Sequence, residues 1–375
     1  MKIEDFKDAV VTVMGLGRFK QGSGVGATKW LMRHGAQVII TDLKSEEELK
    51  ESVDEVMVWY EQYRKDHPDR EMYHPLFVLG EHREEDFTDC AAVLQNPDVG
   101  REDAFVALAR AHNIPIFSDV SLFFHFCPFP ITGVTGTRGK TTTTALIGEM
   151  YKAMDPRAIT AGNIKVSPLE YLDEILKDDK PRPIVLELSS SLIESLGDSG
   201  RGPDIGILTN MFPDHLNRYG SYKEYTLAKE MMFKMQKPEA FAIVNKDNPD
   251  AASIVSSIPS KLYWFTRGED LGGIGGTFVQ DGMIVFRQAG ADEKIIAVTD
   301  VALEGEHNLE NVLAAVCAAK LHGTPNEAII LALKTFKGMP ERHEPSGDHE
   351  SHLFSNDGKD RVPNDFWQIL KLLSR

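Results

Sequence analysis

Short apolar runs alternate with amphipathic segments along most of the chain, a pattern that predicts an α/β protein built on parallel strands. A strongly charged stretch over 45–75 interrupts the first of these alternations and predicts a solvated surface helix. We expect the first α/β layer to close near residue 118. Its predicted elements are strands at 9–14, 37–40, 77–79, 91–94 and 114–117, a glycine-rich turn at 15–26 that leads into a helix ending near 34, and a helix at 102–112.

The second half repeats the pattern on a larger scale. Apolar strands are predicted at 184–188, 205–209 and 240–244, with helical segments between them. Residues 338–375 are polar, end in one amphipathic helix, and are too few for an independent domain. The predicted organisation is therefore a domain over 1–118, a larger α/β domain over 119–337 and a short segment over 338–375.

Charge and composition narrow the class of protein. The 375 residues carry a formal net charge of −16, which disfavours nucleic acid and anionic membranes as partners. The three cysteines are far apart in the sequence, so neither a zinc site nor a redox pair is indicated. No stretch of eighteen apolar residues occurs, and the first residues contain no apolar core of a signal peptide. We expect a cytoplasmic protein with no membrane or nucleic-acid partner.

A glycine loop over 133–144, Gly-Val-Thr-Gly-Thr-Arg-Gly-Lys-Thr-Thr-Thr-Thr, indicates phosphate binding. An apolar strand over 129–132 precedes it, and we expect its helix to be clear from Ala145. Loop amides converge on phosphate oxygens, Lys140 supplies a positive charge, and Thr141 is placed to ligate Mg²⁺. Five residues separate Gly133 from Gly139, one more than in the usual loop, and a helix-capping turn is the structural alternative. An ATP-using enzyme is the leading hypothesis.

Other polar residues follow predicted strands. Glu187 ends one strand, where it could ligate Mg²⁺ together with Thr141 or cap the next helix. His215 lies in the loop after the next strand, and Lys229 in a helix beyond it, where an ordinary exposed lysine is the alternative. Asp42 follows the second strand, but the glycines of the preceding turn do not fit the dinucleotide fingerprint. A dehydrogenase is therefore a weak alternative, because it leaves the glycine loop unused.

Six motifs together resemble the Mur ligases, and within that family most closely the members that add D-glutamate to UDP-N-acetylmuramoyl-L-alanine. They are G-x-T-G-T-x-G-K-T-T-T at 133–143, G-N-I at 162–164, E-L-S-S at 187–190, T-N-x-x-x-D-H-L-N-R-Y at 209–219, the lysine at 229 and G-E-H-N-x-x-N at 305–311. The resemblance implies an N-terminal Rossmann-like domain that binds UDP, a larger ATP-binding domain with the phosphate loop, and a remnant of a third, Rossmann-like domain.

The resemblance also implies a reaction and the residues that carry it. ATP would phosphorylate the substrate carboxylate, and the amine of D-glutamate would attack the acyl phosphate. Lys140, His215 and Lys229 are the implied catalytic residues, and Thr141, Glu187, His215 and a carbamylated Lys229 the implied ligands of two Mg²⁺ ions. Implied ATP contacts are Gly136, Thr137, Arg138, Gly139, Lys140, Thr141, Thr142, Asn308, Asn311, Arg342 and Asp357. Implied contacts to the UDP substrate are Gly15, Leu16, Gly17, Asp42, Asn163 and Ser189.

The sequence departs from the family pattern in two places. After E-L-S-S the family has an aromatic residue and a glutamine, whereas this chain has Ser191 and Leu192. The sequence given ends sixteen residues after Lys359, where the family continues for about 100 residues or more. An alternative to an active ligase is therefore a truncated, catalytically impaired homologue that binds UDP-sugar or ATP, and a partner subunit completing the third domain is a further expectation.

Overall fold

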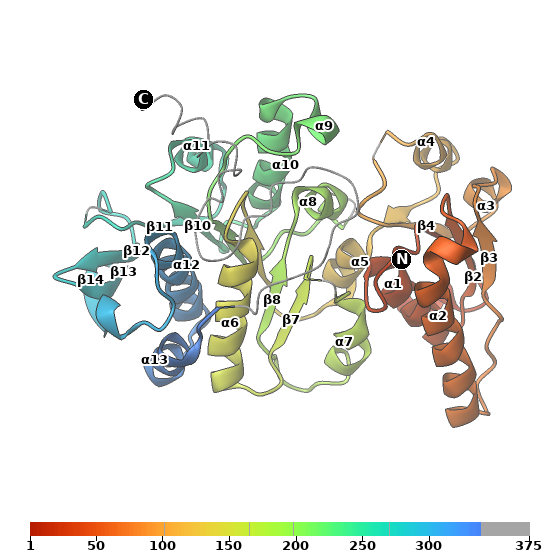
Figure 1. Ribbon diagram of the computed structural model, residues 1–375, viewed down its shortest axis with the longest axis horizontal. Helices are drawn as coiled ribbons and strands as arrows, with labels where there is room; N and C mark the ends of the chain where they lie inside the picture. The colour runs from red at the N-terminus through yellow and green to blue at the C-terminus, as the bar shows by residue number, and fades with distance from the viewer. Residues whose placement is uncertain (101, 165, 198, 270, 339–375) are drawn as a thin grey trace, which may run out of the picture.

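The computed structural model describes residues 1–100, 102–164, 166–197, 199–269 and 271–338, which form two sheets side by side (Figure 1). The N-terminal sheet has the strand order β3-β2-β1-β4-β5, and all its strands are parallel. Its elements are β1 (Val10–Met14), α1 (Ser23–Arg33), β2 (Gln37–Asp42), α2 (Glu46–Asp66), β3 (Leu76–Leu79), α3 (Glu85–Thr88), β4 (Ala92–Gln95), α4 (Ala104–Ala111) and β5 (Ile116–Phe117).

The central sheet has nine strands in the order β14-β13-β12-β11-β10-β9-β6-β8-β7. The strands from β7 to β12 are parallel, and β13 and β14 add an antiparallel edge. The strands are β6 (Thr132–Thr135), β7 (Ile159–Gly162), β8 (Ile184–Glu187), β9 (Ile205–Leu208), β10 (Phe241–Asn245), β11 (Lys261–Phe265), β12 (Gly276–Gln280), β13 (Met283–Gln288) and β14 (Ala291–Ala297).

Helices cover both faces of the central sheet. They are α5 (Asp119–Phe126), α6 (Lys140–Met154), α7 (Leu169–Ile175), α8 (Ser190–Leu196), α9 (Leu216–Tyr219), α10 (Tyr222–Lys234), α11 (Pro249–Ser253), α12 (Glu306–His322) and α13 (Asn326–Thr335). Strand β6 lies between β8 and β9, so the chain leaves it at a point where the strand order reverses. Ligands of open α/β sheets bind at such switch points, beyond the carboxyl ends of the strands.

The predicted α/β alternation is confirmed, with two corrections. Helix α6 begins at Lys140, five residues earlier than Ala145, and β6 contains Gly133, so the loop proper is only Gly136–Gly139. β-Branched threonines are weak helix formers, but Thr143 and Thr144 are completely buried, and α6 packs against β8 and α12. Tertiary packing therefore overrides local propensity. The parallel strands β7, β11 and β12 and the antiparallel strands β13 and β14 were not predicted.

The charged stretch over 45–75 forms the predicted surface helix, α2. Ser45 Oγ accepts from the Glu48 N–H (3.4 Å) and Glu48 Oε2 accepts from the Ser45 N–H (3.0 Å), which closes a capping box at the first turn. One narrow stripe of the helix is buried, consisting of Leu49, Ser52, Val56 and Tyr60. The rest carries the charges into solvent.

The two sheets are joined through α1, which packs against α5 and α7 (Figure 1). Asp173 on α7 accepts hydrogen bonds from Trp30 Nε1 (3.0 Å) and Arg33 Nε (2.7 Å) on α1. A Cβ atom at Gly26 would lie 2.8 Å from Ser167 Oγ, so the two backbones approach closely. Helix α1 is therefore held in place against α7 and the residues just before it.

The three cysteines are buried and free. No helix within the described ranges combines the length and apolarity needed to cross a bilayer.

Candidate active site

The phosphate loop occupies the switch point of the central sheet. Gly136 (φ 149°) and Gly139 (φ 80°) have backbone conformations that favour glycine. A Cβ atom at Gly136 would overlap Thr209 Oγ1, and one at Gly139 would overlap Asn311 Oδ1. The loop is therefore pressed between β9 and α12, and its N–H groups stand at the N-terminus of the fifteen-residue helix α6. This arrangement suits an anion.

Residues after β9 support the loop, a role that the sequence did not reveal. The Arg138 N–H donates to Asn210 Oδ1 (2.9 Å), and Thr209 Oγ1 donates to the Arg138 carbonyl oxygen (2.6 Å). Thr137 Oγ1 donates to the Phe212 carbonyl oxygen (3.2 Å). The first residues of the T-N motif thus fix the loop conformation. They can do so because β9 lies beside β6, so the residues that follow the two strands are neighbours.

Two lysines point into the same region. Lys140 Nζ donates to the Thr137 carbonyl oxygen (3.0 Å), and burial lowers the pKa of Lys140, against the opposing effect of Glu187 and Asp214. Lys229 is only 1% exposed, which excludes the alternative of an ordinary exposed helix lysine. Its Nζ donates to the Gly136 carbonyl oxygen (2.9 Å). Burial, reinforced by Lys140, holds the pKa of Lys229 well below its usual range, so its amine is neutral over a wider pH range than that of an ordinary lysine.

Glu187 is 2% exposed at the end of β8. Its Oε1 accepts a hydrogen bond from Asn163 Nδ2 (2.9 Å), whereas its Oε2 is buried and has no hydrogen-bond partner within the described residues. A buried carboxylate oxygen without a donor is costly unless a cation or ligand satisfies it. The free carboxylate oxygen of Glu187 therefore fits a hard divalent cation at the carboxyl edge of the central sheet.

His215 occupies a left-handed backbone position (φ 51°) immediately before α9. Its side chain is 61% exposed, with Nε2 3.7 Å from Asp214 Oδ2. Its ring centroid lies 6.0 Å from that of Tyr225, and Lys229 Nζ lies 4.6 Å from the same Tyr225 ring. In the part of the chain described, no three histidine, cysteine or acidic side chains gather closely enough to hold a metal ion. A cation there would also need ligands of another kind, such as the Thr141 hydroxyl.

Asn311 and Asn308, two of the predicted ATP contacts, lie on α12, and Asn311 is in contact with the phosphate loop. Asn311 Oδ1 accepts from Thr143 Oγ1 (3.2 Å), and Asn311 Nδ2 donates to Asn308 Oδ1 (3.3 Å). Asn308 Nδ2 in turn donates to the Glu304 carbonyl oxygen (2.7 Å). The structure therefore brings Asn311 against the loop, where its side chain connects α12 to α6, and Asn308 supports Asn311 from the preceding turn of α12. Arg342 and Asp357, predicted as further ATP contacts, lie outside the described residues.

A cleft of about 400 Å³ lies between the glycine-rich turn after β1 and the loop after β7. Its lining includes Leu16, Gly17 and Asn163, three of the predicted substrate contacts. Asn163 lines the cleft while its amide holds Glu187, so it connects the cleft to the carboxylate beside the phosphate loop. The sequence did not identify the opposite wall, Asn96–Asp98, although it follows β4 at the carboxyl edge of the N-terminal sheet, where Asp42 ends β2.

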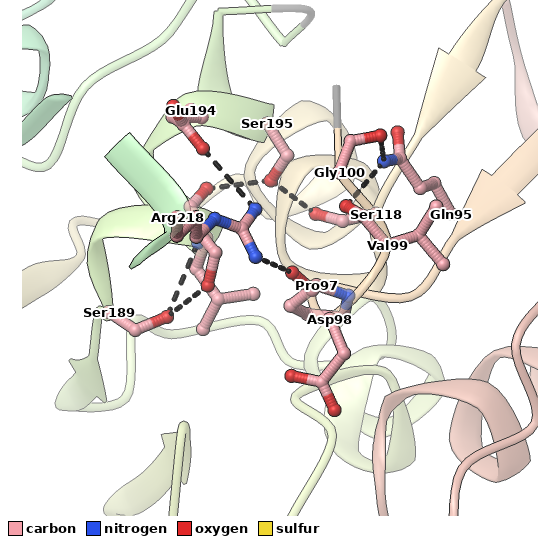
Figure 2. Close-up of polar contacts among 12 residues, drawn as sticks. Gln95, Pro97, Asp98, Val99, Gly100, Ser118, Ser189, Glu194, Ser195 and Arg218 are labelled. Carbon is pink, nitrogen blue, oxygen red and sulfur yellow. Dashed lines mark hydrogen bonds and ion pairs between the residues drawn. The ribbon is translucent and has the colours of Figure 1, made fainter. Parts of the chain in front are cut away.

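The remaining predicted substrate residues make contacts within the protein. Asp42 Oδ2 accepts from the N–H groups of Leu16 (3.0 Å) and Gly17 (3.5 Å), so it organises the turn that lines the cleft. The Gly15 carbonyl oxygen accepts from Asn96 Nδ2 (3.1 Å). Ser189 is not among the residues that line the cleft; it caps α8 by accepting from the Leu192 N–H (3.3 Å), as Figure 2 shows.

Comparison with known proteins agrees with this geometry. Residues 134–319 match the family described as the Mur ligase middle domain. The UDP-N-acetylmuramoylalanine--D-glutamate ligase of Roseiflexus sp. (strain RS-1) is 37% identical over 357 residues, covering 94% of this chain and 72% of that protein. The protein of the same name from Koribacter versatilis (strain Ellin345) is 31% identical over 362 residues, covering 95% of this chain and 73% of that protein.

Solved structures of low sequence identity share the fold. The UDP-N-acetylmuramate:L-alanyl-gamma-D-glutamyl-meso-diaminopimelate ligase from Neisseria meningitides superposes with a TM-score of 0.58 at 16% identity, covering 89% of this chain and 99% of that chain. A murein peptide ligase from Psychrobacter arcticus 273-4 gives a TM-score of 0.54 at 14% identity, covering 91% of this chain and 71% of that chain.

Proposed function

The chain belongs to the Mur ligase family, and we propose that it adds D-glutamate to UDP-N-acetylmuramoyl-L-alanine in an ATP-dependent step of peptidoglycan precursor synthesis. The names of its relatives support this substrate pair. The observation on this chain that carries the proposal is the position of Asn163, which lines the nucleotide-sized cleft and donates to Glu187 beside the phosphate loop. One extended substrate could therefore occupy the cleft and reach the loop.

In the proposed reaction the γ-phosphoryl group of ATP moves to the terminal carboxylate of UDP-N-acetylmuramoyl-L-alanine, giving an acyl phosphate and ADP. The amine of D-glutamate then attacks the carbonyl carbon. A C–N bond forms, the C–O bond to phosphate breaks, and phosphate and a proton leave. The task of the protein is to hold three reactants in line and to balance negative charge, which accounts for most of the catalysis in phosphoryl transfer.

The proposed ATP site combines loop amides with one cation. N–H groups of the phosphate loop would bind the β- and γ-phosphates, and Lys140 would neutralise charge on the group in transfer. The proposed ATP contacts are Gly136, Thr137, Arg138, Gly139, Lys140, Thr141, Thr142, Asn308 and Asn311, with Arg342 and Asp357 from the segment outside the described residues.

Mg²⁺ would supply further charge neutralisation, held by Thr141, Glu187, His215 and Lys229. The unpartnered Oε2 of Glu187 supports this assignment. A neutral Lys229 amine can attack the carbon of CO₂: an N–C bond forms, one C=O bond becomes a C–O⁻ bond and one proton is released, which leaves a carbamate whose single negative charge is shared by two oxygens. Burial of Lys229 supports this modification, because it favours the neutral, nucleophilic amine.

The UDP part of the substrate is assigned to the cleft. Gly15, Leu16, Gly17, Asp42, Asn163 and Ser189 are the proposed contacts or supports. Because the Asp42 carboxylate already accepts two loop N–H groups, it supports the turn as well as any contact it makes to substrate.

Product identification tests the proposal. The full chain is incubated with ATP, Mg²⁺, UDP-N-acetylmuramoyl-L-alanine and D-glutamate, and the UDP-linked product is examined by mass spectrometry. We expect the mass of the substrate to increase by one glutamyl residue, and L-glutamate in place of the D-isomer serves as the matched control. An unchanged substrate mass together with measurable substrate binding would indicate a binding module instead.

A further inference from the structure

Arg218, the penultimate residue of the T-N-x-x-x-D-H-L-N-R-Y motif, reaches from the central domain to the N-terminal domain (Figure 2). Its Nη1 donates to the Pro97 carbonyl oxygen (3.1 Å), and its Nη2 lies 3.4 Å from Glu194 Oε2 on α8. Pro97 lines the substrate cleft, whereas Arg218 is not among its lining residues. We propose that Arg218 is a positioning residue that holds the Asn96–Asp98 wall of the UDP cleft in place relative to the phosphate loop.

The guanidinium group is held on both sides. The side chain of Arg218 is 28% exposed and that of Glu194 is 18% exposed, so the ion pair is partly shielded from solvent. Glu194 orients the planar group, and its second nitrogen then faces the carbonyl oxygen. A lysine has one nitrogen in place of two donor nitrogens held in a plane, so it would not reproduce this geometry.

The wall that Arg218 contacts is connected to the rest of the cleft. Asn96 Nδ2 donates to the Gly15 carbonyl oxygen (3.1 Å), and a Cβ atom at Gly15 would lie only 2.8 Å from Asn96 Cβ. The Asn96 side chain also accepts from the Asp98 N–H (3.1 Å). A displacement of Pro97 would therefore be felt by both the Asn96–Asp98 wall and the Gly15–Gly17 turn.

Arg218 is also tied to the reactive end of the site. It lies three residues after His215, and the beginning of the same motif fixes the phosphate loop through Thr209 and Asn210. Glu194 belongs to the helix that Ser189 caps. Arg218 thus connects the support of the phosphate loop, helix α8 and the cleft wall. This inference rests on the proposed function. By holding the cleft wall, Arg218 sets the position of the bound UDP group relative to the phosphate loop, where the carboxylate of the same substrate reacts.

The structure offers a matched control. Ser118 Oγ and Ser195 Oγ form a second hydrogen bond (2.7 Å) close to Arg218, also drawn in Figure 2, but neither residue lines the cleft. Ser195→Ala removes that contact and leaves the wall untouched. It therefore separates a general loss of packing in this region from the loss of the Pro97 contact.

The experiment measures binding of UDP-N-acetylmuramoyl-L-alanine and of ATP to the full chain by calorimetry. For Arg218→Met we expect the Kd of the UDP substrate to rise about fivefold, which is the effect expected from losing one partly exposed hydrogen bond from a charged group. The Kd of ATP should stay within about twofold, because the altered contact lies away from the ATP site. Glu194→Gln, which keeps an acceptor but removes the charge, should give a smaller rise in the same direction, and Ser195→Ala none.

The outcomes separate this inference from the proposed function. Unchanged substrate binding in both Arg218→Met and Glu194→Gln, with a wild type that binds, would overturn the positioning role and leave the ligase proposal intact. An equal loss of ATP and substrate binding would overturn it as well, since that points to general disruption. A wild-type chain that does not bind the UDP substrate would overturn both. Should Arg218→Met melt at a much lower temperature, Glu194→Gln decides.

Discussion

Lys229 Nζ donates a hydrogen bond to the carbonyl oxygen of Gly136 over 2.9 Å, which ties α10 directly to the phosphate loop. The amine is almost completely buried and is close enough to Lys140 for the second cation to lower its pKa further. Burying an amine in surroundings that disfavour its positive charge lowers the free energy of unfolding, and such strongly shifted groups are typical of functional sites. The predictions below begin from this contact.

Replacing Lys229 should change how stability depends on pH. The folded-state pKa of Lys229 lies below the ordinary value of 10.5, so between these two values the unfolded chain binds a proton that the folded chain does not. The stability of the wild type relative to Lys229→Met should therefore fall as the pH decreases below 10.5, by up to about 1.4 kcal/mol per pH unit. Urea unfolding of both proteins at pH 7, 8 and 9 measures the difference. A difference that is constant over this range would contradict the buried neutral amine.

Gly139→Ala should remove ATP binding and lower stability. Gly290→Ala is a matched control, because Gly290 has a similar φ of +79° but nothing within 4 Å of its Cβ position. Both variants should lose about 1 kcal/mol from the left-handed backbone, and Gly139→Ala about 1–3 kcal/mol more from overlap with Asn311. Thermal unfolding and ATP titration check this. Equal losses of stability in the two variants would argue against the close approach of α12 to the loop.

Glu187→Gln keeps the shape of the side chain but removes the negative charge. We expect turnover to fall about 100-fold or more, because a Mg²⁺ ligand is lost. Thermal stability should be unchanged or higher, since the buried oxygen without a donor is no longer charged. Turnover is measured over a Mg²⁺ titration, with Glu149→Gln on the exposed face of α6 as the control. A lower melting temperature with unchanged turnover would assign Glu187 to a structural role.

Asp42→Asn tests whether this carboxylate organises the turn or contacts ribose. Both carboxylate oxygens accept backbone N–H groups, Oδ2 from Leu16 and Gly17 and Oδ1 from Lys44, so in either orientation the amide places its N–H₂ group against an N–H donor, and affinity for UDP should fall about tenfold. If Asp42 acts only through the turn, the Asp42→Asn variant should lose affinity by the same factor, relative to the wild type, for UDP, 2′-deoxy-UDP and 3′-deoxy-UDP. A deoxy ligand that binds wild type and variant equally would instead reveal a direct ribose contact.

Local sequence patterns were enough to locate the strands of the N-terminal sheet, part of the central sheet and the phosphate loop. The phosphate loop can be recognised from neighbouring residues alone, because an apolar run, the glycines and the lysine follow one another directly. The capping box of α2 likewise depends on two residues that are three positions apart. The amphipathic pattern from Ala145 shows only the later part of α6; the helix already begins at Lys140, because packing against β8 overrides the weak helix propensity of Thr141–Thr144. Glu187 and His215 were predicted because they lie at or after the ends of strands. Asn96 follows the predicted strand over 91–94 and could have been predicted for the same reason.

Other features depend on contacts between distant segments. The charged residues of α10 give no local sign that Lys229 is almost completely buried, since its surroundings include Gly136 of the phosphate loop and Glu187 at the end of β8. The contact of Arg218 with Pro97 joins residues that are 121 positions apart, and the Asp42 contacts depend on how the first turn folds back. Such contacts follow from the tertiary arrangement, so they could not be read from spacing or composition.

The central claim is that the phosphate loop and the UDP cleft serve one ligation, and coupled phosphate release tests it most directly. Phosphate is measured with ATP, Mg²⁺ and UDP-N-acetylmuramoyl-L-alanine, with and without D-glutamate, for the wild type and for Lys140→Ala. We predict release that requires both the UDP substrate and D-glutamate and that disappears in the variant. Phosphate release that is independent of D-glutamate, or absent although the UDP substrate binds, would contradict the account.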